Sequence, residues 1–176
     1  MGFKEVVAAT PKLAGQWQAG LGALRPQDKS HVTPEDTSTA RLRGSVDIDS
    51  ALTASDPNGN RWDFAIGYQH ANRSDEYIYW VETHTGSDSQ ISLVLRKLAW
   101  LKTWLKGDGK KLAKFDKSFV WVPSGATSFT KGATQVRMLA DQGLLYTGSV
   151  FKIPINHATA KLDNATHNRS RRSAYA

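Results

Sequence analysis

Residues 61–105 read RWDFAIGYQHANRSDEYIYWVETHTGSDSQISLVLRKLAWLKTWL and carry the strongest structural pattern in the chain. In the first half, alternating apolar residues predict two strands, 62–68 and 77–84, joined by a polar turn. In the second half, apolar residues recur at i, i+3, i+4 and i+7, which predicts an amphipathic helix from Gln90 to Leu105. The stretch therefore predicts strand, strand, helix.

The alternation also predicts which side chains share a face. On the first strand the large apolar residues lie together, and Asp63 lies on the other face between small neighbours. On the second strand one face begins apolar and ends polar, with the residues Ile78, Trp80, Glu82 and His84. We expect the long helix to cover this second face, which brings the polar residues near its underside.

The flanking segments complete a mixed sheet. Upstream, apolar residues predict a leading helix from about Lys12 to Leu24, a loop over 25–40 and a strand over 42–52. The turn SDPNGN at 55–60 makes that strand the antiparallel neighbour of the next. Downstream, the patterns predict a strand at 119–122, a short helix around 136–140 and a last strand at 150–155.

The expected fold class is thus α/β with a mixed central sheet and the order α-β-β-β-α-β-α-β. The first three strands form an antiparallel meander, and the strand after the long helix pairs parallel to the third through a right-handed crossover. Residues 1–157 are predicted to form one domain, since this length suits a single core. The polar tail, 158–176, is basic and predicted to be disordered.

Composition limits the functional classes. The net charge of +7 favours polyanionic partners such as nucleic acid. The chain has no cysteine, so disulfides, thiolate metal sites and cysteine nucleophiles are excluded and any chemistry must use oxygen and nitrogen groups. No apolar run approaches the ~20 residues that cross a bilayer, and no signal peptide is evident, so we expect a cytoplasmic protein without membrane contact.

Asp63 and Glu82 are the candidate metal ligands. Phosphodiester hydrolysis with Mg²⁺ needs hard oxygen ligands, and neighbouring strands supply them when two carboxylates point to the same side. His84 follows Glu82 on the same face, about 7 Å further along the strand, where it is placed to orient an attacking water. The pattern predicts a metal-dependent site acting on phosphodiesters.

This arrangement resembles the PD-(D/E)XK nuclease superfamily, with a helix, three strands carrying Asp and then Glu-x-Lys, a helix and a strand. The resemblance spans about residues 13–122 and implies a restriction-endonuclease-like core, Mg²⁺ as cofactor and nucleic acid as substrate. It places Asp63 and Glu82 as the metal ligands and Gln90 as a polar helper in the first turn of the helix. His84 stands where Lys is expected, and histidine, unlike lysine, does not carry a permanent positive charge.

Lys97 is the candidate replacement for that missing charge. It lies two helical turns beyond Gln90, about 10 Å along the axis, so its side chain must reach back toward the site. A second resemblance, carried by GSVDID, RWDFAIGY, WVETHTG and LRKLAWLKTWL, is to a group of bacterial proteins of uncharacterised function. It covers most of the chain and assigns no activity.

Structural alternatives exist for each of these residues. Asp63 could instead pair with Arg61 or cap the hairpin. Lys97 could belong to a solvated helix face with Lys102 and Lys106. A pair of helix residues, Trp100 and Trp104, could pack against the body of the protein or stack on single-stranded bases. The alternative to a nuclease is therefore a noncatalytic module that binds nucleic acid or a protein partner.

Overall fold

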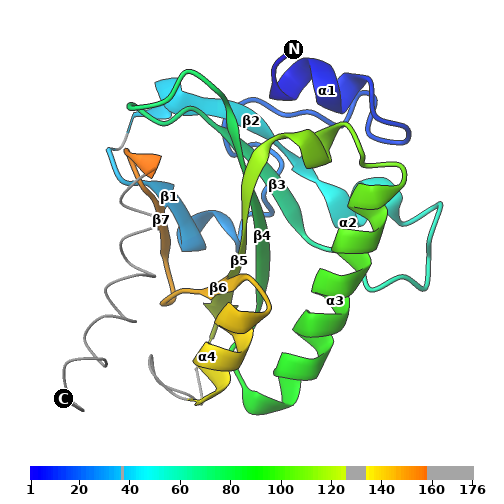
Figure 1. The fold of residues 1–176 in the computed structure, drawn as a ribbon, viewed down its shortest axis with the longest axis vertical. Helices are drawn as coiled ribbons and strands as arrows, with labels where there is room; N and C mark the ends of the chain where they lie inside the picture. The colour runs from blue at the N-terminus through cyan, green and yellow to red at the C-terminus, as the bar shows by residue number, and fades with distance from the viewer. Residues whose placement is uncertain (37, 126–133, 158–176) are drawn as a thin grey trace.

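The computed structural model describes residues 1–36, 38–125 and 134–157, and it contains a mixed sheet of order β2-β3-β4-β5-β6 (Figure 1). The strands of this sheet are β2 (Leu42–Asp47), β3 (Phe64–Tyr68), β4 (Tyr77–Thr85), β5 (Asp116–Ser124) and β6 (Leu144–Tyr146). The helices are α1 (Phe3–Ala8), α2 (Ile48–Leu52), α3 (Asp88–Lys106) and α4 (Thr134–Asp141). A separate two-stranded parallel sheet consists of β1 (Val32–Pro34) and β7 (Phe151–Ile153).

The predicted α/β class with a mixed sheet is confirmed. Strands β2, β3 and β4 are antiparallel neighbours, and β5 lies parallel to β4 after the crossover through α3. The α3 helix begins at Asp88 and ends at Lys106, close to the predicted bounds. The α4 helix likewise matches the short helix expected there.

Helix α3 covers one face of the sheet. Its apolar residues, spaced by three and four positions, are buried against Ile78 and Trp80 of β4 and Trp121 of β5. They are Ile91, Val94, Leu98, Leu101 and Leu105. The face of β4 that contains Ile78, Trp80 and Glu82 therefore lies under the helix, as the alternation predicted.

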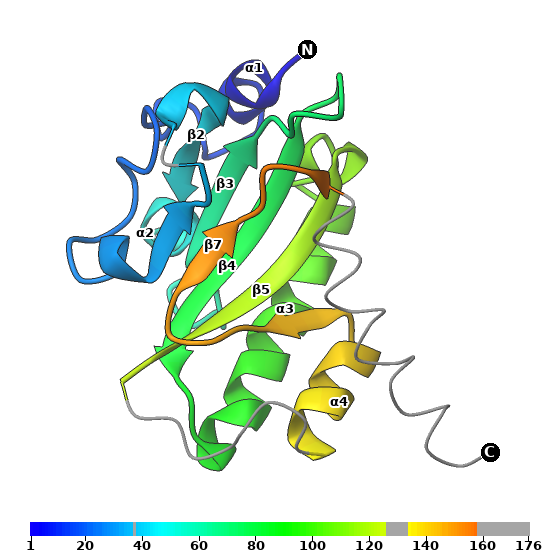
Figure 2. The same ribbon diagram turned by 90° about the vertical axis from the view of Figure 1, so that its left-hand side faces the viewer.

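The β1–β7 pair packs on the opposite face, in front of β4 in Figure 2. His70, just after β3, joins the two layers. Its Nδ1 lies 3.1 Å from the carbonyl oxygen of Pro154, and its Nε2 lies 3.1 Å from the hydroxyl of Tyr79 on β4. With only 1% of its surface exposed, His70 forms a buried, neutral link between the layers.

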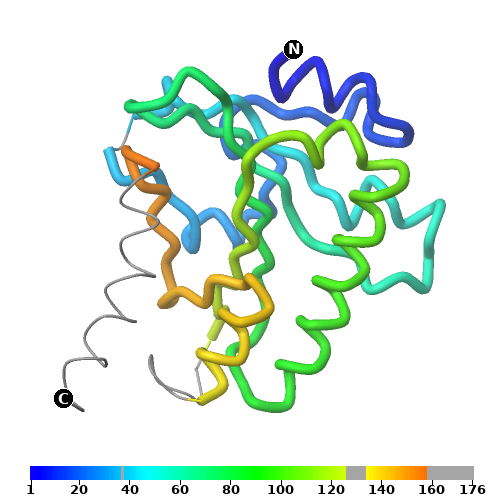
Figure 3. Tube along the Cα trace, in the orientation of Figure 1, coloured from blue at the N-terminus to red at the C-terminus, as the bar shows by residue number. Residues whose placement is uncertain are grey.

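The predicted helix from Lys12 to Leu24 is wrong. The helix is instead α1, and the chain beyond it follows an irregular path of turns, seen at the start of the trace in Figure 3. Lys12, Gly15 and Gly20 all have positive φ values, which no α-helix accommodates. Leu13 and Leu24 are buried and Trp17 and Leu21 are partly buried, without helical periodicity.

Three other expectations need correction. The strand predicted over 42–52 ends at Asp47, whose side chain accepts a hydrogen bond from the Ser50 backbone and starts α2. The loop expected over 25–40 contains β1. The last strand exists as β7 but pairs with β1, while the unpredicted β6 extends the main sheet beside β5. The tail, 158–176, lies outside the described residues.

Candidate active site

Asp63 and Glu82 meet where β3 begins beside β4. The register pairs Phe64 with Val81, so the next pair outward brings Asp63 opposite Glu82. The backbone N–H of Asp63 donates to Glu82 Oε2 at 3.2 Å, and the carbonyl of Asp63 accepts from the backbone N–H of Ile48 at 2.9 Å. The sheet and the first turn of α2 thus fix the backbone that carries the first carboxylate.

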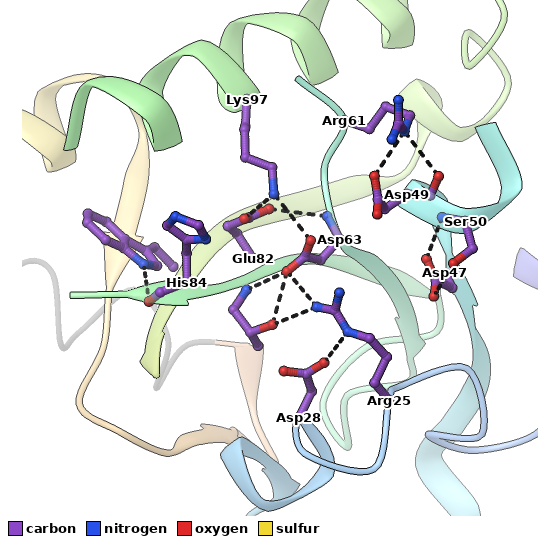
Figure 4. A network of polar contacts seen from close by, with 12 residues as sticks. Arg25, Asp28, Asp47, Asp49, Ser50, Arg61, Asp63, Glu82, His84 and Lys97 are labelled. Carbon is purple, nitrogen blue, oxygen red and sulfur yellow. Dashed lines mark hydrogen bonds and ion pairs between the residues drawn. The ribbon is translucent and has the colours of Figure 1, made fainter. Parts of the chain in front are cut away.

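Lys97 reaches both carboxylates from α3. Its ammonium donates to Asp63 Oδ1 at 3.2 Å and also to Glu82 Oε1, as Figure 4 shows. Two oxygens that share one ammonium nitrogen lie within about 6 Å of each other, given ordinary hydrogen-bond lengths of about 3 Å. The two predicted metal ligands are therefore close enough to share a cation.

This cluster is almost completely removed from solvent. Glu82 has 0% of its surface exposed and Asp63 5%, while 13% of the Lys97 side chain is exposed. Burial, together with the negative charge of Asp63, raises the pKa of Glu82 from 4.5 to about 8, against the opposing effect of Lys97. Burial alone would lower the pKa of Lys97, but the two carboxylates outweigh it and raise that pKa.

Arg25 approaches Asp63 from the opposite side, a contact that sequence reasoning missed. Its Nη2 donates to Asp63 Oδ2 at 3.1 Å and to Thr83 Oγ1 at 3.3 Å. Its Nε donates to Asp28 Oδ2 at 2.5 Å, and Asp28 is itself only 4% exposed. The backbone N–H and the hydroxyl of Thr83 both donate to Asp63 Oδ2 at 3.0 Å, so this carboxylate is held from two sides.

His84 and Gln90 form a pair of their own beside this cluster. His84 Nε2 lies 2.8 Å from Gln90 Oε1, and both side chains are half-buried. The carbonyl of His84 accepts from Trp121 Nε1 at 3.1 Å, which ties the end of β4 to β5. Within the described ranges, no hydrogen bond joins this pair to Asp63 or Glu82. Lys97, and not His84, therefore supplies the positive charge that contacts the two carboxylates.

The structural alternatives for these residues have clear outcomes. Arg61 pairs with Asp49, with Nε and Oδ1 2.9 Å apart, and not with Asp63. Lys97 is turned into the protein, so it does not belong to a solvated face. The rings of Trp100 and Trp104 stack on each other with 7° between their planes, and Trp104 packs edge-on against a third indole, that of Trp80.

The two tryptophans border a separate hollow of about 320 Å³. Its lining residues are Lys12, Leu52, Ser55, Asp56, Trp100, Thr103, Trp104 and Asp108. None of the clustered carboxylates lines it. The hollow and the Asp63–Glu82 cluster are therefore two distinct places on the molecule.

The donor set of the cluster suits a small hard cation. Mg²⁺ in proteins commonly uses one or two carboxylates and keeps several waters or substrate oxygens, so Asp63 and Glu82 are sufficient protein ligands for it. Among residues 1–36, 38–125 and 134–157, no group of three or more acidic or histidine side chains is arranged to hold a metal. A bound ion would have to take over the oxygens that Lys97 now contacts.

A scan against protein-family models, a search of curated proteins and a search of solved structures found no match to this chain. Of the helices in the described part of the chain, none is both long enough and apolar enough to cross a bilayer.

Proposed function

We propose that this protein is a metal-dependent nuclease with a restriction-endonuclease-like core, in which Asp63 and Glu82 hold Mg²⁺ and Lys97 supplies the positive charge. The observation that carries the proposal is the convergence of three ionisable side chains from three elements on one point. Lys97 Nζ contacts both carboxylates, although Asp63 and Lys97 are 34 residues apart in the chain.

The arrangement of elements supports the same proposal. The resemblance to PD-(D/E)XK nucleases implies an antiparallel meander, a crossover helix and a parallel strand, with carboxylates on the second and third strands. The meander β2-β3-β4, the helix α3 and the parallel β5 have this order and pairing. Asp63 directly precedes the second of these strands and Glu82 lies on the third.

The energetics of burial also favour a functional role. A buried ion pair contributes little net stability, because the cost of desolvating its charges offsets their mutual attraction. Glu82 is fully buried beside a second carboxylate, which raises its pKa far from the ordinary range. Strongly perturbed carboxyl groups of this kind concentrate at catalytic sites.

The metal ion and the residues of the cluster would have different roles in the reaction. A bound Mg²⁺ would polarise the phosphodiester and lower the pKa of a coordinated water. Lys97, whose ammonium lies beside both carboxylates, would neutralise negative charge that develops on the phosphate. His84 and Gln90, a half-buried pair, are polar groups that can hold water near the reacting atoms.

Cleavage assays test this function directly. Single- and double-stranded DNA and RNA are incubated with the wild type in Mg²⁺, in Mn²⁺ and in a chelator. We expect metal-dependent cleavage that Glu82→Gln abolishes and Asp49→Asn preserves, because Asp49 is paired with Arg61 outside the cluster. Cleavage that is equal in the two variants, or no cleavage of any substrate, would overturn the proposal.

A second candidate is a noncatalytic module that binds nucleic acid. Four exposed lysines, Lys106, Lys110, Lys111 and Lys114, lie at and beyond the end of α3, on a chain of net charge +7. Contacts between lysines and phosphates give nucleic-acid binding that weakens steeply as the salt concentration rises. Salt-sensitive binding that survives in an Asp63→Asn/Glu82→Gln double variant, without cleavage by the wild type, would favour this candidate.

A further inference from the structure

Arg25 lies on the opposite side of Asp63 from Lys97. It belongs to the irregular segment between α1 and β1, and its guanidinium lies over the ring of Phe64, 5.1 Å from the ring centroid. Phe64 packs on the face of the sheet opposite α3. Two cations from different faces of the sheet thus contact one carboxylate, Asp63, one on each oxygen.

The guanidinium of Arg25 is held in a fixed orientation. Its Nε and Nη2 donate to the side chains of Asp28, Asp63 and Thr83. The first of these acceptors, Asp28, is 4% exposed, and within the described part of the chain its carboxylate forms hydrogen bonds and ion pairs with Arg25 alone. A buried carboxylate that is paired with one arginine keeps the guanidinium in a single orientation, as preorganised binding requires.

One part of this guanidinium remains available. None of the hydrogen bonds among the described residues uses Nη1 of Arg25, and 38% of the side chain is exposed, against 6% for each of its two carboxylate partners. Arginine is permanently charged and its planar donors match the oxygens of a phosphate. The free amino group is therefore a fixed, solvent-facing donor beside the candidate metal ligands.

We propose that Arg25 is a catalytic residue that binds the scissile phosphodiester through Nη1. The inference rests on the proposed nuclease function and adds a second cation to the site. In the reaction, a water oxygen forms a bond to phosphorus and the bond from phosphorus to one sugar oxygen breaks. The water loses a proton to solvent and the leaving oxygen gains one, which gives a phosphomonoester and an alcohol. Arg25 stabilises the non-bridging oxygens and keeps its own protons.

Arg25→Ala tests this inference, with Arg41→Ala as the matched control. Arg41 also pairs with an aspartate, at 3.1 Å, and is similarly exposed at 34%, but it lies away from the cluster. We expect the Arg25 variant to cleave about 100-fold more slowly or worse, as for loss of a preorganised donor to developing charge. Its Mn²⁺ affinity should stay within a few fold of the wild type, because the metal ligands remain.

Chemical rescue separates contact with substrate from a structural role. Guanidinium ion at millimolar concentration should restore part of the activity of Arg25→Ala and leave Arg41→Ala unchanged. Arg25→Lys provides a folded alternative if the alanine variant is unstable. We expect it also to cleave slowly, because one ammonium cannot contact both carboxylates and a phosphate together.

The outcomes distinguish this inference from the proposed function. If the wild type cleaves and Glu82→Gln does not, but Arg25→Ala and Arg25→Lys match Arg41→Ala, the role of Arg25 is overturned and the nuclease function stands. If the wild type cleaves no nucleic acid with Mg²⁺ or Mn²⁺, both are overturned. Slow cleavage by the Arg25 variants, with guanidinium rescue, supports both.

Discussion

Two buried polar networks lie on opposite faces of the same sheet and differ in charge. Under α3, Asp63 and Glu82 share the ammonium of Lys97. On the other face, His70 links the carbonyl of Pro154 to the hydroxyl of Tyr79. Both networks are almost free of solvent, since Glu82 and His70 are 0% and 1% exposed.

The difference in charge is consistent with a structural role for one network and with the proposed chemical role for the other. The His70 network pairs neutral donors with neutral acceptors, and it joins the β7 layer to the main sheet at low cost. The Glu82 network buries several formal charges, which contributes little net stability and perturbs the carboxyl group. This contrast agrees with the proposed catalytic role of the charged network and with a cohesive role of the neutral one between the layers.

Glu82→Gln should have the largest effect of any single change considered in these two networks. We expect cleavage to fall by more than about 100-fold, which exceeds the usual loss for a residue that only supports a metal ligand. Stability should be unchanged or higher, because the substitution replaces a buried carboxyl group with an amide of nearly the same shape. Steady-state cleavage rates and urea unfolding at pH 8 measure the two effects.

The contrary result would be a large loss of stability with normal cleavage. Glu82 would then be a structural residue, and the contrast between the two networks would disappear. His70→Phe is the reciprocal control, because it removes the polar link on the other face and should leave cleavage within a few fold of the wild type.

Lys97→Met should reduce both activity and stability. We expect about 100-fold slower cleavage, and a loss of about 3–5 kcal/mol in the free energy of unfolding at pH 8, because two buried carboxylates lose their shared cation. The loss should be smaller at pH 6, where Glu82 can take up a proton. Affinity for Mn²⁺ should rise, since Lys97 no longer competes for the oxygens.

Lys106→Met is the control for Lys97→Met, because Lys106 is exposed at the end of the same helix. It should leave stability within about 0.5 kcal/mol of the wild type. Equal effects of the two substitutions would show that the contacts of Lys97 with the carboxylates contribute nothing specific.

The two networks should give opposite dependences of stability on pH. The pKa of Glu82 is raised from 4.5 to about 8 on folding, so the folded state holds more protons in this window and stability falls as pH rises through it. Burial lowers the pKa of His70 from 6.5, so the unfolded state binds more protons at acid pH and stability falls as pH drops below about 6.5. Each slope is at most about 1.4 kcal/mol per pH unit for one proton.

Urea unfolding between pH 4 and 9 checks both slopes. Glu82→Gln should flatten the decline toward pH 8, and His70→Phe should flatten the decline toward acid pH. If Glu82→Gln leaves the alkaline slope unchanged, its carboxyl group is not the one with the raised pKa.

His70→Phe should lower the free energy of unfolding by less than Lys97→Met does. The ring packing against Tyr68 and Tyr77 is kept, but the carbonyl of Pro154 and the hydroxyl of Tyr79 lose their partner. A buried polar group without a partner costs about 1–3 kcal/mol. Thermal or urea unfolding at pH 8 measures this loss, and a loss below 0.5 kcal/mol by the same methods would contradict the assigned cohesive role.

The elements with strong periodicity were predictable from sequence. The antiparallel strands β2 and β3, the strand β4 and the helix α3 all follow from alternation or from helical spacing, because each buries one face. The same alternation placed Asp63 and Glu82 on neighbouring strands. Beyond this alternation, only the register between β3 and β4 was required to bring the two carboxylates together.

Other features could not be predicted from a sequence pattern. Strands β1 and β6 are three residues long, too short for alternation to distinguish them from loop, and the alternation that predicted β7 did not identify β1 as its partner. Positive φ values at Lys12 and Gly15 depend on tertiary packing, and they prevent the helix that the apolar spacing predicted. Arg25 lies 38 residues before Asp63 in a segment without regular structure, so no sequence spacing pointed to it.

Mn²⁺ binding, followed by electron paramagnetic resonance, tests whether Asp63 and Glu82 hold a metal ion. We expect one site in the wild type that is lost in Asp63→Asn and in Glu82→Gln and is retained in Asp49→Asn. Binding should be tighter in Lys97→Met. Absence of a site in the wild type, or equal binding by all these variants, would contradict the assignment of this cluster as a metal-dependent active site.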